Sequence, residues 1–527
     1  MKKNNHIIIA ASCLLFSFLF AKELPSNLNN NRNTSRVAVA NGPNTSVLNI
    51  NQIAYWISAD GAYTTGGSPN GVSADYPIFT GGFIYADGML WGAVVKDSLD
   101  VDGNPVQKTD TGVRVGGSTY GHGLAAGRVI YDAATGDVVG ADDPSTNHVW
   151  RVRKDWETAD LTVDAANFKG YGSTDLVTDA DIADVKAQYE YDWTNWPAAW
   201  GAPYEDVDSS GTYDPLVDIP GYVGADQTMW IVANDVPTKL IGYDSAAGTY
   251  TSTSTLNTAP TLYGSDPIGI ELQVTLWGYA LGASDPLGNV IFKQAKMVYT
   301  GLPDTPEGAM MDDVFFTQWS DPDLGTYTDD YVGSDVDLSF GYVYNGNRLD
   351  GVFNSIYNLP VPAGGYDFFQ GPLNNKNISI DGNVPEVLPM TSFTYFGAGS
   401  AIDDPDQAVF EGSLQFYNLM NGLLPRPEWP NGIPWEDPIT GENTQFVLSG
   451  DPVTGTGWVD GIQLPPGDRR MVMASGPFMM ERGDTAEVVL GIVGGMGLDQ
   501  LSSVSVAKFH DKTAQYAYNV EFDLPSA

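Results

Sequence analysis

Closely spaced acidic side chains are the residues of this sequence that most clearly offer chemistry. Residues 321–335 contain five aspartates, interrupted by Pro322, Gly325 and Gly333. Carboxylates this close repel one another unless a cation lies among them, and Ca²⁺ takes six to eight oxygen ligands from flexible loops. We therefore predict a structural Ca²⁺ site whose ligands are Asp321, Asp323, Asp329, Asp330 and Asp335.

A second acidic loop, residues 206–218, matches the first half of a DxDxSG calcium loop. In such a loop alternate side chains point at the ion, and Gly211 at the sixth position permits the sharp turn. Val217 replaces the glutamate expected at the twelfth position, so Asp218 would have to close the site. The alternative is an Asp-rich turn satisfied by its own backbone. The predicted ligands are Asp206, Asp208, Ser210, Thr212, Asp214 and Asp218.

Transition-metal and nucleophilic chemistry have little support. Beyond the N-terminal segment the histidines are His122, His148 and His510, which show no HExxH spacing, and Cys13 is the only cysteine. No GxSxG nucleophile elbow is present. A glycosidase would need two carboxylates facing each other across an aromatic cleft. With 65 acidic residues and 13 tryptophans, the sequence does not select such a pair.

The strongly acidic balance of the chain limits its partners. The 527 residues include 25 Lys and Arg against 65 Asp and Glu, a formal charge of −40. Nucleic acids and anionic membrane surfaces would repel such a protein at long range. With 43% hydrophobic residues the chain can bury a substantial core. We therefore expect a folded protein that binds neither nucleic acid nor membrane, and whose partner is an extracellular glycan or a surface protein.

The N-terminus predicts export. Lys2 and Lys3 precede an apolar run from Ile7 to Phe20, and Ala21 offers a cleavage point, which together indicate a signal peptide over residues 1–21. Without Cys13 the secreted chain has no disulfide, and bound Ca²⁺ is an alternative way to hold its loops. No later apolar run is long enough to span a membrane. We expect an extracellular or cell-surface location.

Turn signals between short apolar runs predict antiparallel β structure. An Asp-Gly pair at Asp87–Gly88 between two apolar-aromatic runs indicates a hairpin, and Asp102–Gly103 indicates a second turn. The strict alternation of apolar residues over 270–276 predicts a strand with one buried face. The segments 471–474 and 485–493 are expected to form a final strand pair.

Helices are expected at only a few places. Thr178 begins a capping-box-like start to a helix that ends before Pro197, and Asp499–Asn519 is predicted to form a closing helix. The aromatic residues of the first helix could stack on sugars or dock the helix on a sheet, and we favour docking. The predicted fold is mainly β, with one or two antiparallel β-sandwich-like units and a few inserted helices.

The expected organisation has one to three domains. A flexible lead-in over residues 22–47 follows the signal peptide. The ordered regions are then an N-terminal β region with a helical insertion (48–200), a central β region with the Asp-rich loops (201–400) and a C-terminal β region with a closing helix (401–527).

Seven short motifs stand out along the chain: Arg114–Tyr120, Gly201–Asp206, Gly224–Trp230, Asp321–Gly325, Asp330–Asp335, Gly365–Pro372 and Ser475–Phe478. Together they resemble an uncharacterised family of large secreted proteins from Bacteroidetes-like and related marine bacteria. The resemblance spans about 48–525 and implies no assigned activity. Members often continue into fibronectin-like modules and a type IX secretion sorting domain, whereas this sequence stops at Ala527. We expect either a truncated product or export without that signal.

Two functional hypotheses follow. The first is a secreted, calcium-stabilised β protein of the cell surface or extracellular matrix with a non-enzymatic binding, adhesion or structural role. The second is a secreted hydrolase of polysaccharides, in which a carboxylate pair acts in a Trp-lined cleft bordered by Trp429–Trp435.

Overall fold

The computed structural model describes residues 44–522, except for residues 110, 121–122, 132–137, 140–146, 237–240, 245–248, 252–263, 375–385 and 408. The predicted signal peptide lies outside the described residues, as do His122 and most of the predicted lead-in. The first strand, β1 (Thr45–Leu48), already includes the last three residues of that lead-in. The fold is mainly β, as predicted, and its two large sheets are antiparallel throughout.

The larger sheet runs in the order β12-β15-β18-β19-β30-β23-β22-β21, with β9 beside β15. The predicted alternation is present in β18, where Ile270, Leu272 and Val274 enter the main core. The strands are β9 (Ala125–Ala126), β12 (Trp150–Arg153), β15 (Gln227–Asn234), β18 (Ile270–Gly278), β19 (Val290–Tyr299), β21 (Asp330–Asp335), β22 (Phe340–Asn345), β23 (Ala363–Gln370) and β30 (Thr485–Gly495).

The smaller sheet faces the larger one across the main hydrophobic core. In its strands alternate residues point to opposite sides, so Met89 and Trp91 enter that core whereas Leu90 points outward. Burial of both faces explains why β5 is apolar over most of its length after Gly88, and β29 over most of its length after Arg470. The order is β26 (Ser392–Gly397), β29 (Arg469–Glu481), β20 (Met310–Asp321), β5 (Ala86–Lys96) and β8 (Val113–Gly117).

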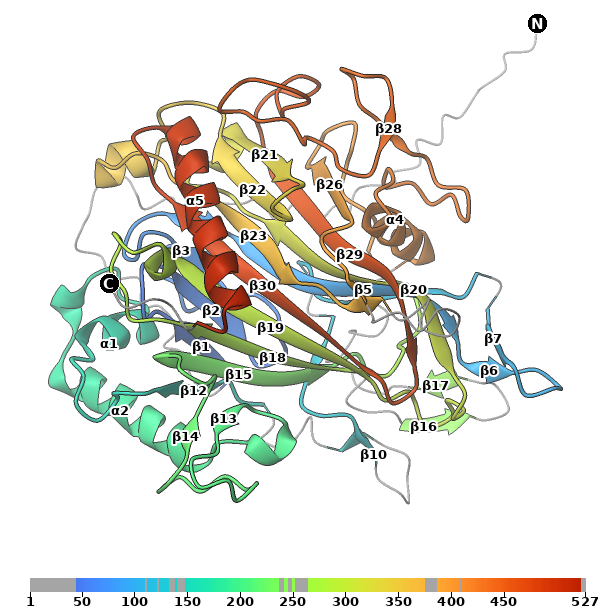
Figure 1. The fold of residues 1–527 in the computed structure, drawn as a ribbon, viewed down its shortest axis with the longest axis horizontal. Helices are drawn as coiled ribbons and strands as arrows, with labels where there is room; N and C mark the ends of the chain where they lie inside the picture. The colour runs from blue at the N-terminus through green and yellow to red at the C-terminus, as the bar shows by residue number, and fades with distance from the viewer. Residues whose placement is uncertain are drawn as a thin grey trace, which may run out of the picture. The chain divides into compact units, whose positions relative to one another are not determined.

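A helix covers the outer face of each sheet (Figure 1). Helix α5 (Gln500–Asn519) packs Val504, Ala507 and Ala514 on the larger sheet, and the small alanines allow a close approach. Helix α4 (Phe410–Met420) packs on the smaller sheet through Phe416 and Leu419. Within the described part of the chain, no helix combines the length and apolarity needed to cross a membrane.

Two further helices pack at the side of the larger sheet. Helix α2 (Asp179–Thr194) begins at the predicted capping box, in which Thr178 and Asp181 each accept a backbone hydrogen bond from the other. Together with α1 (Thr162–Phe168), which the sequence did not predict, it buries Val185 and Tyr189 against β1 and β2 (Ala54–Ser58). Tyr189 therefore docks the helix, as favoured from the sequence, whereas Tyr191 is 52% exposed.

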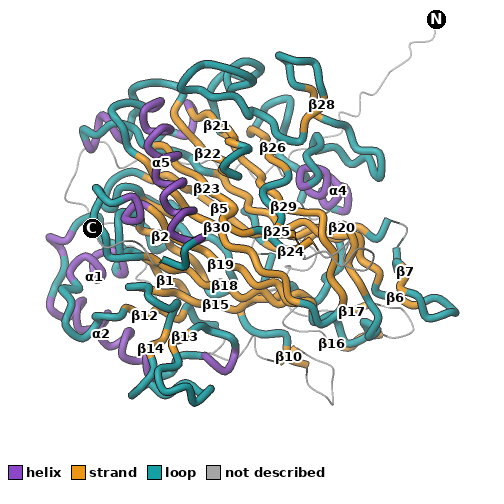
Figure 2. Tube along the Cα trace, in the orientation of Figure 1, coloured by secondary structure: helices purple, strands orange, loops and turns teal. Residues whose placement is uncertain are grey.

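Short elements complete the chain (Figure 2). A small sheet joins β1 and β2 to β3 (Ala74–Asp75) and β4 (Gly82–Ile84). Strand pairs are β6 (Ser98–Leu99) with β7 (Pro105–Val106), β10 (Ile130–Tyr131) with β11 (Val138–Val139), β13 (Tyr204–Glu205) with β14 (Ile219–Pro220), β16 (Ile241–Asp244) with β17 (Thr249–Thr251), β24 (Leu373–Asn374) with β25 (Glu386–Val387), and β27 (Trp435–Glu436) with β28 (Asn443–Thr444). Single turns are η1 (Thr174–Leu176), η2 (Ala198–Trp200), η4 (Pro286–Asn289), η5 (Tyr327–Asp329) and the π-helical η6 (Phe353–Tyr357).

Two of the sequence predictions are wrong. Asp87 and Gly88 form no turn but lie inside β5, because β20 and β8 pair with this strand on either side. The expected final strand pair also does not form, since β29 belongs to the smaller sheet and β30 to the larger one. Both sheets take strands from the three predicted regions 48–200, 201–400 and 401–527.

Candidate metal centres

The first acidic loop connects the short strands β13 and β14. Because Tyr204 pairs with Pro220, the two ends of the loop are held together and Asp206 comes close to Asp218. Carboxylate oxygens of Asp206, Asp208 and Asp218 all lie within 4.8 Å of one another. Asp218 therefore closes this group, as predicted from the sequence, in which Val217 replaces the glutamate expected at the twelfth position of the loop.

Backbone hydrogen bonds fix the direction of these carboxylates. Asp206 accepts from the N–H groups of Ser210 (3.0 Å) and Gly211 (2.8 Å), while Asp218 accepts from those of Val207 (3.0 Å) and Asp214 (2.7 Å). Gly211 has a φ of 75°, a conformation that side-chain-bearing residues rarely adopt. The loop thus positions three oxygen donors of the same kind that hard cations prefer.

The other predicted ligands of this loop take part in hydrogen bonds within it. Ser210 Oγ donates to the carbonyl oxygen of Thr212 at 2.9 Å, and Asp214 Oδ1 accepts from the N–H of Leu216 at 2.9 Å. Of the six predicted ligands, the structure brings three into one carboxylate group. Ser210, Thr212 and Asp214 lie nearby in the loop and outside that group.

The second acidic group forms where β20 ends. Asp321 is the last residue of β20 and is fully buried. After Pro322 the chain turns at Asp323, whose φ of 47° is left-handed. Carboxylate oxygens of Asp321, Asp323 and Asp468 lie within 4.8 Å of one another. Asp468 directly precedes β29, which neighbours β20 in the smaller sheet, and strand pairing therefore brings it to Asp321.

A guanidinium already neutralises part of this second group. Arg470 Nη1 lies 3.0 Å from Asp468 Oδ1, and Nη2 lies 3.6 Å from Asp321 Oδ2. Its Nε lies 3.7 Å from Asp404 Oδ1, and Tyr120 Oη donates to Asp321 at 3.0 Å. Burial raises the pKa of Asp404, and Arg470 opposes that rise. The pKa of the Tyr120 phenol is raised by burial and by Asp321.

Asp329, Asp330 and Asp335, the remaining predicted ligands of residues 321–335, do not belong to this group of three carboxylates. Asp335 forms an ion pair with Lys508 of α5 at 2.8 Å, and Asp329 accepts from Asn347 at 3.2 Å. Asp330 is fully buried and accepts from the N–H of Leu324 at 2.9 Å, while its Oδ1 has no hydrogen-bond partner among the described residues. Burial and the neighbouring Asp323 raise the pKa of Asp330 well above its usual range.

Asp468 and Arg470 were not among the residues predicted from the sequence. Both are far from the acidic loop along the chain, and only the neighbouring positions of β20 and β29 bring them to it. The one local signal is an acidic residue followed by two arginines, a rare arrangement in a chain with only 25 basic residues. Basic residues in so acidic a protein are therefore worth testing as partners of buried carboxylates.

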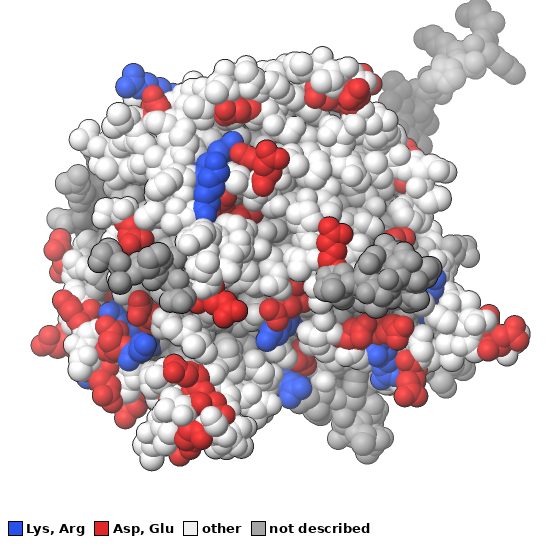
Figure 3. All heavy atoms as spheres, viewed as in Figure 1, with Lys and Arg blue, Asp and Glu red and all other residues white. Residues whose placement is uncertain are grey.

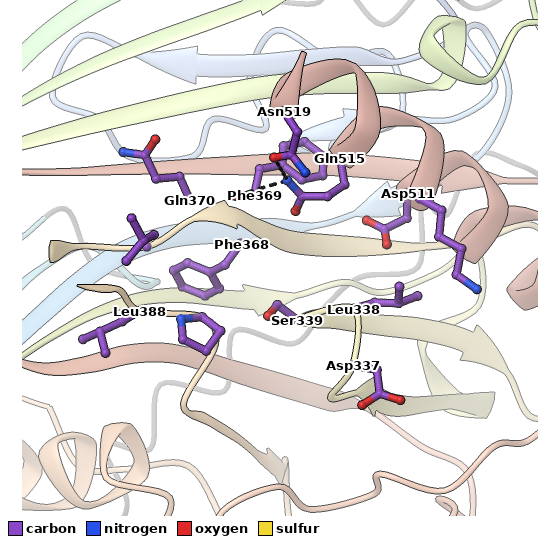
Figure 4. Close-up of a pocket in the computed structure, with 14 residues that line it drawn as sticks. Asp337, Leu338, Ser339, Phe368, Phe369, Gln370, Leu388, Asp511, Gln515 and Asn519 are labelled. Atoms are coloured by element: carbon purple, nitrogen blue, oxygen red, sulfur yellow. Dashed lines mark hydrogen bonds between the residues drawn. The ribbon is translucent and has the colours of Figure 1, made fainter. Parts of the chain in front are cut away.

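A pocket of about 400 Å³ lies between α5, β23 and the segment around Leu388 (Figure 4). Asp511, Gln515 and Asn519 reach it from the helix, and Asp337 borders its other side. Its lining includes no tryptophan and neither acidic group. The arrangement differs from the Trp-lined cleft with a carboxylate pair that the hydrolase hypothesis requires.

The tryptophans expected to border a cleft pack against other rings. Trp429 lies edge-on to Tyr417 with ring centroids 5.0 Å apart, and Trp435 stacks on Tyr395 at 5.5 Å. Trp435 is only 4% exposed. Trp435 is therefore part of the main core, and Trp429 packs against the cluster on the outer face of the smaller sheet.

The donor sets of the two acidic groups fit a hard divalent cation. Both consist of carboxylate oxygens, without the nitrogen or sulfur ligands that favour zinc. The first group offers only oxygen donors, whereas Arg470 competes with a cation at the second. No protein-family model matches this sequence, and no curated protein sequence matches it.

Proposed function

We propose that this chain is an exported, non-enzymatic β protein of the cell surface or extracellular matrix, with a binding, adhesion or structural role, whose loops are stabilised by Ca²⁺. The observation that carries the proposal is that three carboxylates lie within 4.8 Å of one another at each of two places, the 206–218 loop and the end of β20. Ionised carboxylates this close repel one another strongly. A divalent cation would remove that repulsion and tie each loop to the sheet beside it.

The first group supports the proposal most directly. No lysine or arginine of the described residues forms an ion pair with Asp206, Asp208 or Asp218. Asp208 is exposed whereas Asp218 is 2% exposed, so the group is open to an ion on one side and fixed to the fold on the other. Ca²⁺ suits this setting better than Mg²⁺, because Mg²⁺ demands near-ideal octahedral geometry.

The distribution of charge supports a binding partner without phosphate groups. Acidic side chains are spread over the face shown in Figure 3 instead of gathering in one patch. With a formal charge of −40, the surface would repel nucleic acid and anionic lipid. An extracellular glycan or a surface protein is the partner class that this charge allows, and acquisition of Ca²⁺ fits the extracellular location.

The placement of the acidic groups supports a role other than catalysis. The first group lies in the loop between β13 and β14, the second lies at the end of β20 and in the segment before β29, and neither lines the pocket beside α5. A hydrolase would use two carboxylates at the floor of a cleft, one as acid and one as base or nucleophile. Carboxylates on connecting loops are better suited to hold those loops.

Thermal unfolding with and without Ca²⁺ tests the metal component. We expect millimolar Ca²⁺ to raise the Tm relative to EGTA, because an ion that binds only the folded state stabilises it by about 2.7 kcal/mol at one hundred times its Kd. Mg²⁺ at the same concentration is the control and should raise the Tm less. An identical Tm in Ca²⁺, Mg²⁺ and EGTA would reject a calcium site.

Export is tested separately. The full chain should be recovered outside the producing bacterial cell, with a new N-terminus within a few residues of Ala21, and N-terminal sequencing locates it. Retention in the cytoplasm with residues 1–21 still attached would contradict the extracellular role and leave the metal test unaffected.

A further inference from the structure

A lysine lies buried between the two large sheets. Lys293 is on β19, where alternate residues point into the main core, and it is 1% exposed. Its Nζ donates to Gln318 Oε1 at 3.1 Å and lies 3.6 Å from Asp87 Oδ2. Gln318 and Asp87 come from β20 and β5 of the opposite sheet and are each 1% exposed. The three side chains meet across the interior of the sandwich.

Burial of Lys293 disfavours its charged form, whereas Asp87 and the ring of Tyr55, 5.9 Å from Nζ, favour it. The neighbouring core positions on β19 are Ile291 and Ala295, both buried, and the nearby Met89 of β5 is also apolar. Burial lowers the pKa of Lys293, and Asp87 acts in the opposite direction. A neutral amine is a nucleophile, whereas an ammonium ion is not. An ion pair enclosed in this way carries a large desolvation cost.

We propose that Lys293 forms an intramolecular isopeptide bond with the side chain of Gln318, promoted by Asp87. Three features of the geometry support this assignment. The amine already contacts the amide oxygen of Gln318, the carboxylate of Asp87 lies beside both groups, and all three are held away from water. This modification is independent of the metal sites and of the proposed extracellular role.

The reaction balances without an oxidant or a second substrate. The neutral Nζ of Lys293 attacks the amide carbon of Gln318, forming an N–C bond and placing negative charge on Oε1. Asp87 accepts a proton from Nζ and returns it to Nε2 of Gln318 as general acid. The C–Nε2 bond then breaks and ammonia leaves. One amine and one primary amide become one secondary amide and ammonia, and the protein loses 17 Da, the mass of ammonia.

Hydrogen bonds place Asp87 for both proton transfers. Tyr55 Oη donates to both oxygens of Asp87 at 3.0 Å, and Tyr366 Oη donates to Oδ2 at 3.2 Å. Nε2 of Gln318 lies 3.4 Å from the same Oδ2. One carboxylate oxygen therefore lies between the attacking nitrogen, 3.6 Å away, and the leaving nitrogen.

The bond would connect the two sheets covalently. Lys293 belongs to the larger sheet and Gln318 to the smaller one, so the link would cross the core and restrain their separation. A disulfide cannot do this within the chain, because Cys13 is its only cysteine. Cross-links lower the entropy of the unfolded chain and thereby stabilise the fold.

Peptide mass spectrometry of the folded full chain tests the proposal. We expect one cross-linked peptide pair that joins Lys293 to Gln318, with a mass 17 Da below the sum of its parts, the mass of one ammonia. Unmodified Lys293 and Gln318 peptides from the folded protein would overturn the proposal. A link to Asp87 with loss of 18 Da, the mass of one water, would overturn the assignment to Gln318.

Matched variants identify the roles of the three side chains. Lys293→Met should abolish the cross-link, whereas Lys296→Met, on the same strand but with a partly exposed side chain, should retain it. Asp87→Ala keeps both reacting groups, and the rate of bond formation should fall about 10²-fold or more. A fully formed cross-link at an unchanged rate in a folded Asp87→Ala protein would remove Asp87 from the mechanism. If this variant does not fold, the mass of the unaltered chain still decides whether the bond exists.

Discussion

Asp511 of α5 faces Asp367 of β23, and both side chains are fully buried. They lie in the layer between the helix and the outer face of the larger sheet, where Phe340 and Phe369 are neighbours. Burial and the second carboxyl raise the pKa of Asp367, and burial raises the pKa of Asp511 to about 7. A shared proton lets two such groups hydrogen-bond to each other instead of repelling.

This pair predicts a stability that falls as the pH rises. Because the folded pKa of Asp511 is about 7 and the unfolded value is near 3.8, the folded state binds more protons between these values. The free energy of unfolding should therefore decrease from pH 4 to pH 7 through this pair. Urea unfolding in EGTA at several pH values measures the effect without interference from metal binding.

The variant Asp511→Asn should reduce this pH dependence, because it removes one of the two carboxyls whose pKa is raised in the folded state and takes its charge away from Asp367. Asp337→Asn is the control, since Asp337 borders the same pocket but is exposed. Equal pH slopes in Asp511→Asn and in the unaltered chain would show that the pair does not share a proton.

The start of α2 gives a prediction about stability alone. Thr178 is exposed, and its hydroxyl accepts from the N–H of Asp181 at 3.3 Å. Thr178→Ala should lower the free energy of unfolding by about 1 kcal/mol, because the first turn loses its cap. Thr194→Ala, at the exposed end of the same helix, should change it by less than about 0.5 kcal/mol. Equal losses in urea unfolding would contradict the capping role.

Local signals predicted those parts of the fold that local interactions determine. The capping box at Thr178 and the alternation over 270–276 each specify an element within one short segment, and both are present. Asp87–Gly88 predicted a turn that does not exist. A Cβ at Gly88 would lie 1.9 Å from the carbonyl oxygen of Ser118, so glycine is needed for the close approach of β5 and β8. The sequence pattern cannot distinguish that reason from a turn.

The partners of β29 and β30 could not be predicted from the sequence, because strand pairing depends on contacts between segments far apart in the chain. β29 and β30 are separated by a short turn but join different sheets, and both are buried on both faces over most of their length. A strand buried on both faces has no polar side to indicate its orientation. The same holds for the candidate metal sites. Asp206, Asp208 and Asp218 lie within one loop and were predicted from it. Asp468 was not predicted, because only the pairing of β20 with β29 brings it close to Asp321.

The first acidic loop predicts a specific loss of Ca²⁺ response. Asp206→Asn keeps the shape and the acceptor oxygen of the side chain but removes one charge from the group, so Ca²⁺ should raise the Tm less than in the unaltered chain. Asp437→Asn is a matched control, since Asp437 accepts a backbone hydrogen bond from Ile439 at 2.7 Å in an exposed turn outside both acidic groups. The Tm should be measured for both variants with Ca²⁺ and with EGTA. A normal Ca²⁺ shift in Asp206→Asn would exclude this loop as the site.

At the second group we expect a substitution to increase the Ca²⁺-induced rise in Tm, because the guanidinium of Arg470 now supplies the positive charge that a cation would supply. Arg470 is 5% exposed and lies beside Asp321, Asp404 and Asp468. Arg470→Met should lower the free energy of unfolding by about 3–5 kcal/mol in EGTA, since it leaves buried carboxylates without their counter-charge. Ca²⁺ should then recover part of that loss, so the Ca²⁺-induced rise in Tm should exceed that of the unaltered chain.

The exposed Arg426→Met serves as the control and should leave both quantities unchanged. Arg470→Lys keeps the positive charge, but an ammonium cannot contact three carboxylates in the geometry of a guanidinium. Its loss in free energy of unfolding should therefore lie between those of Arg426→Met and Arg470→Met. If Arg470→Met loses stability and Ca²⁺ recovers none of it, the second group is an ion-pair network of Arg470 and does not bind metal.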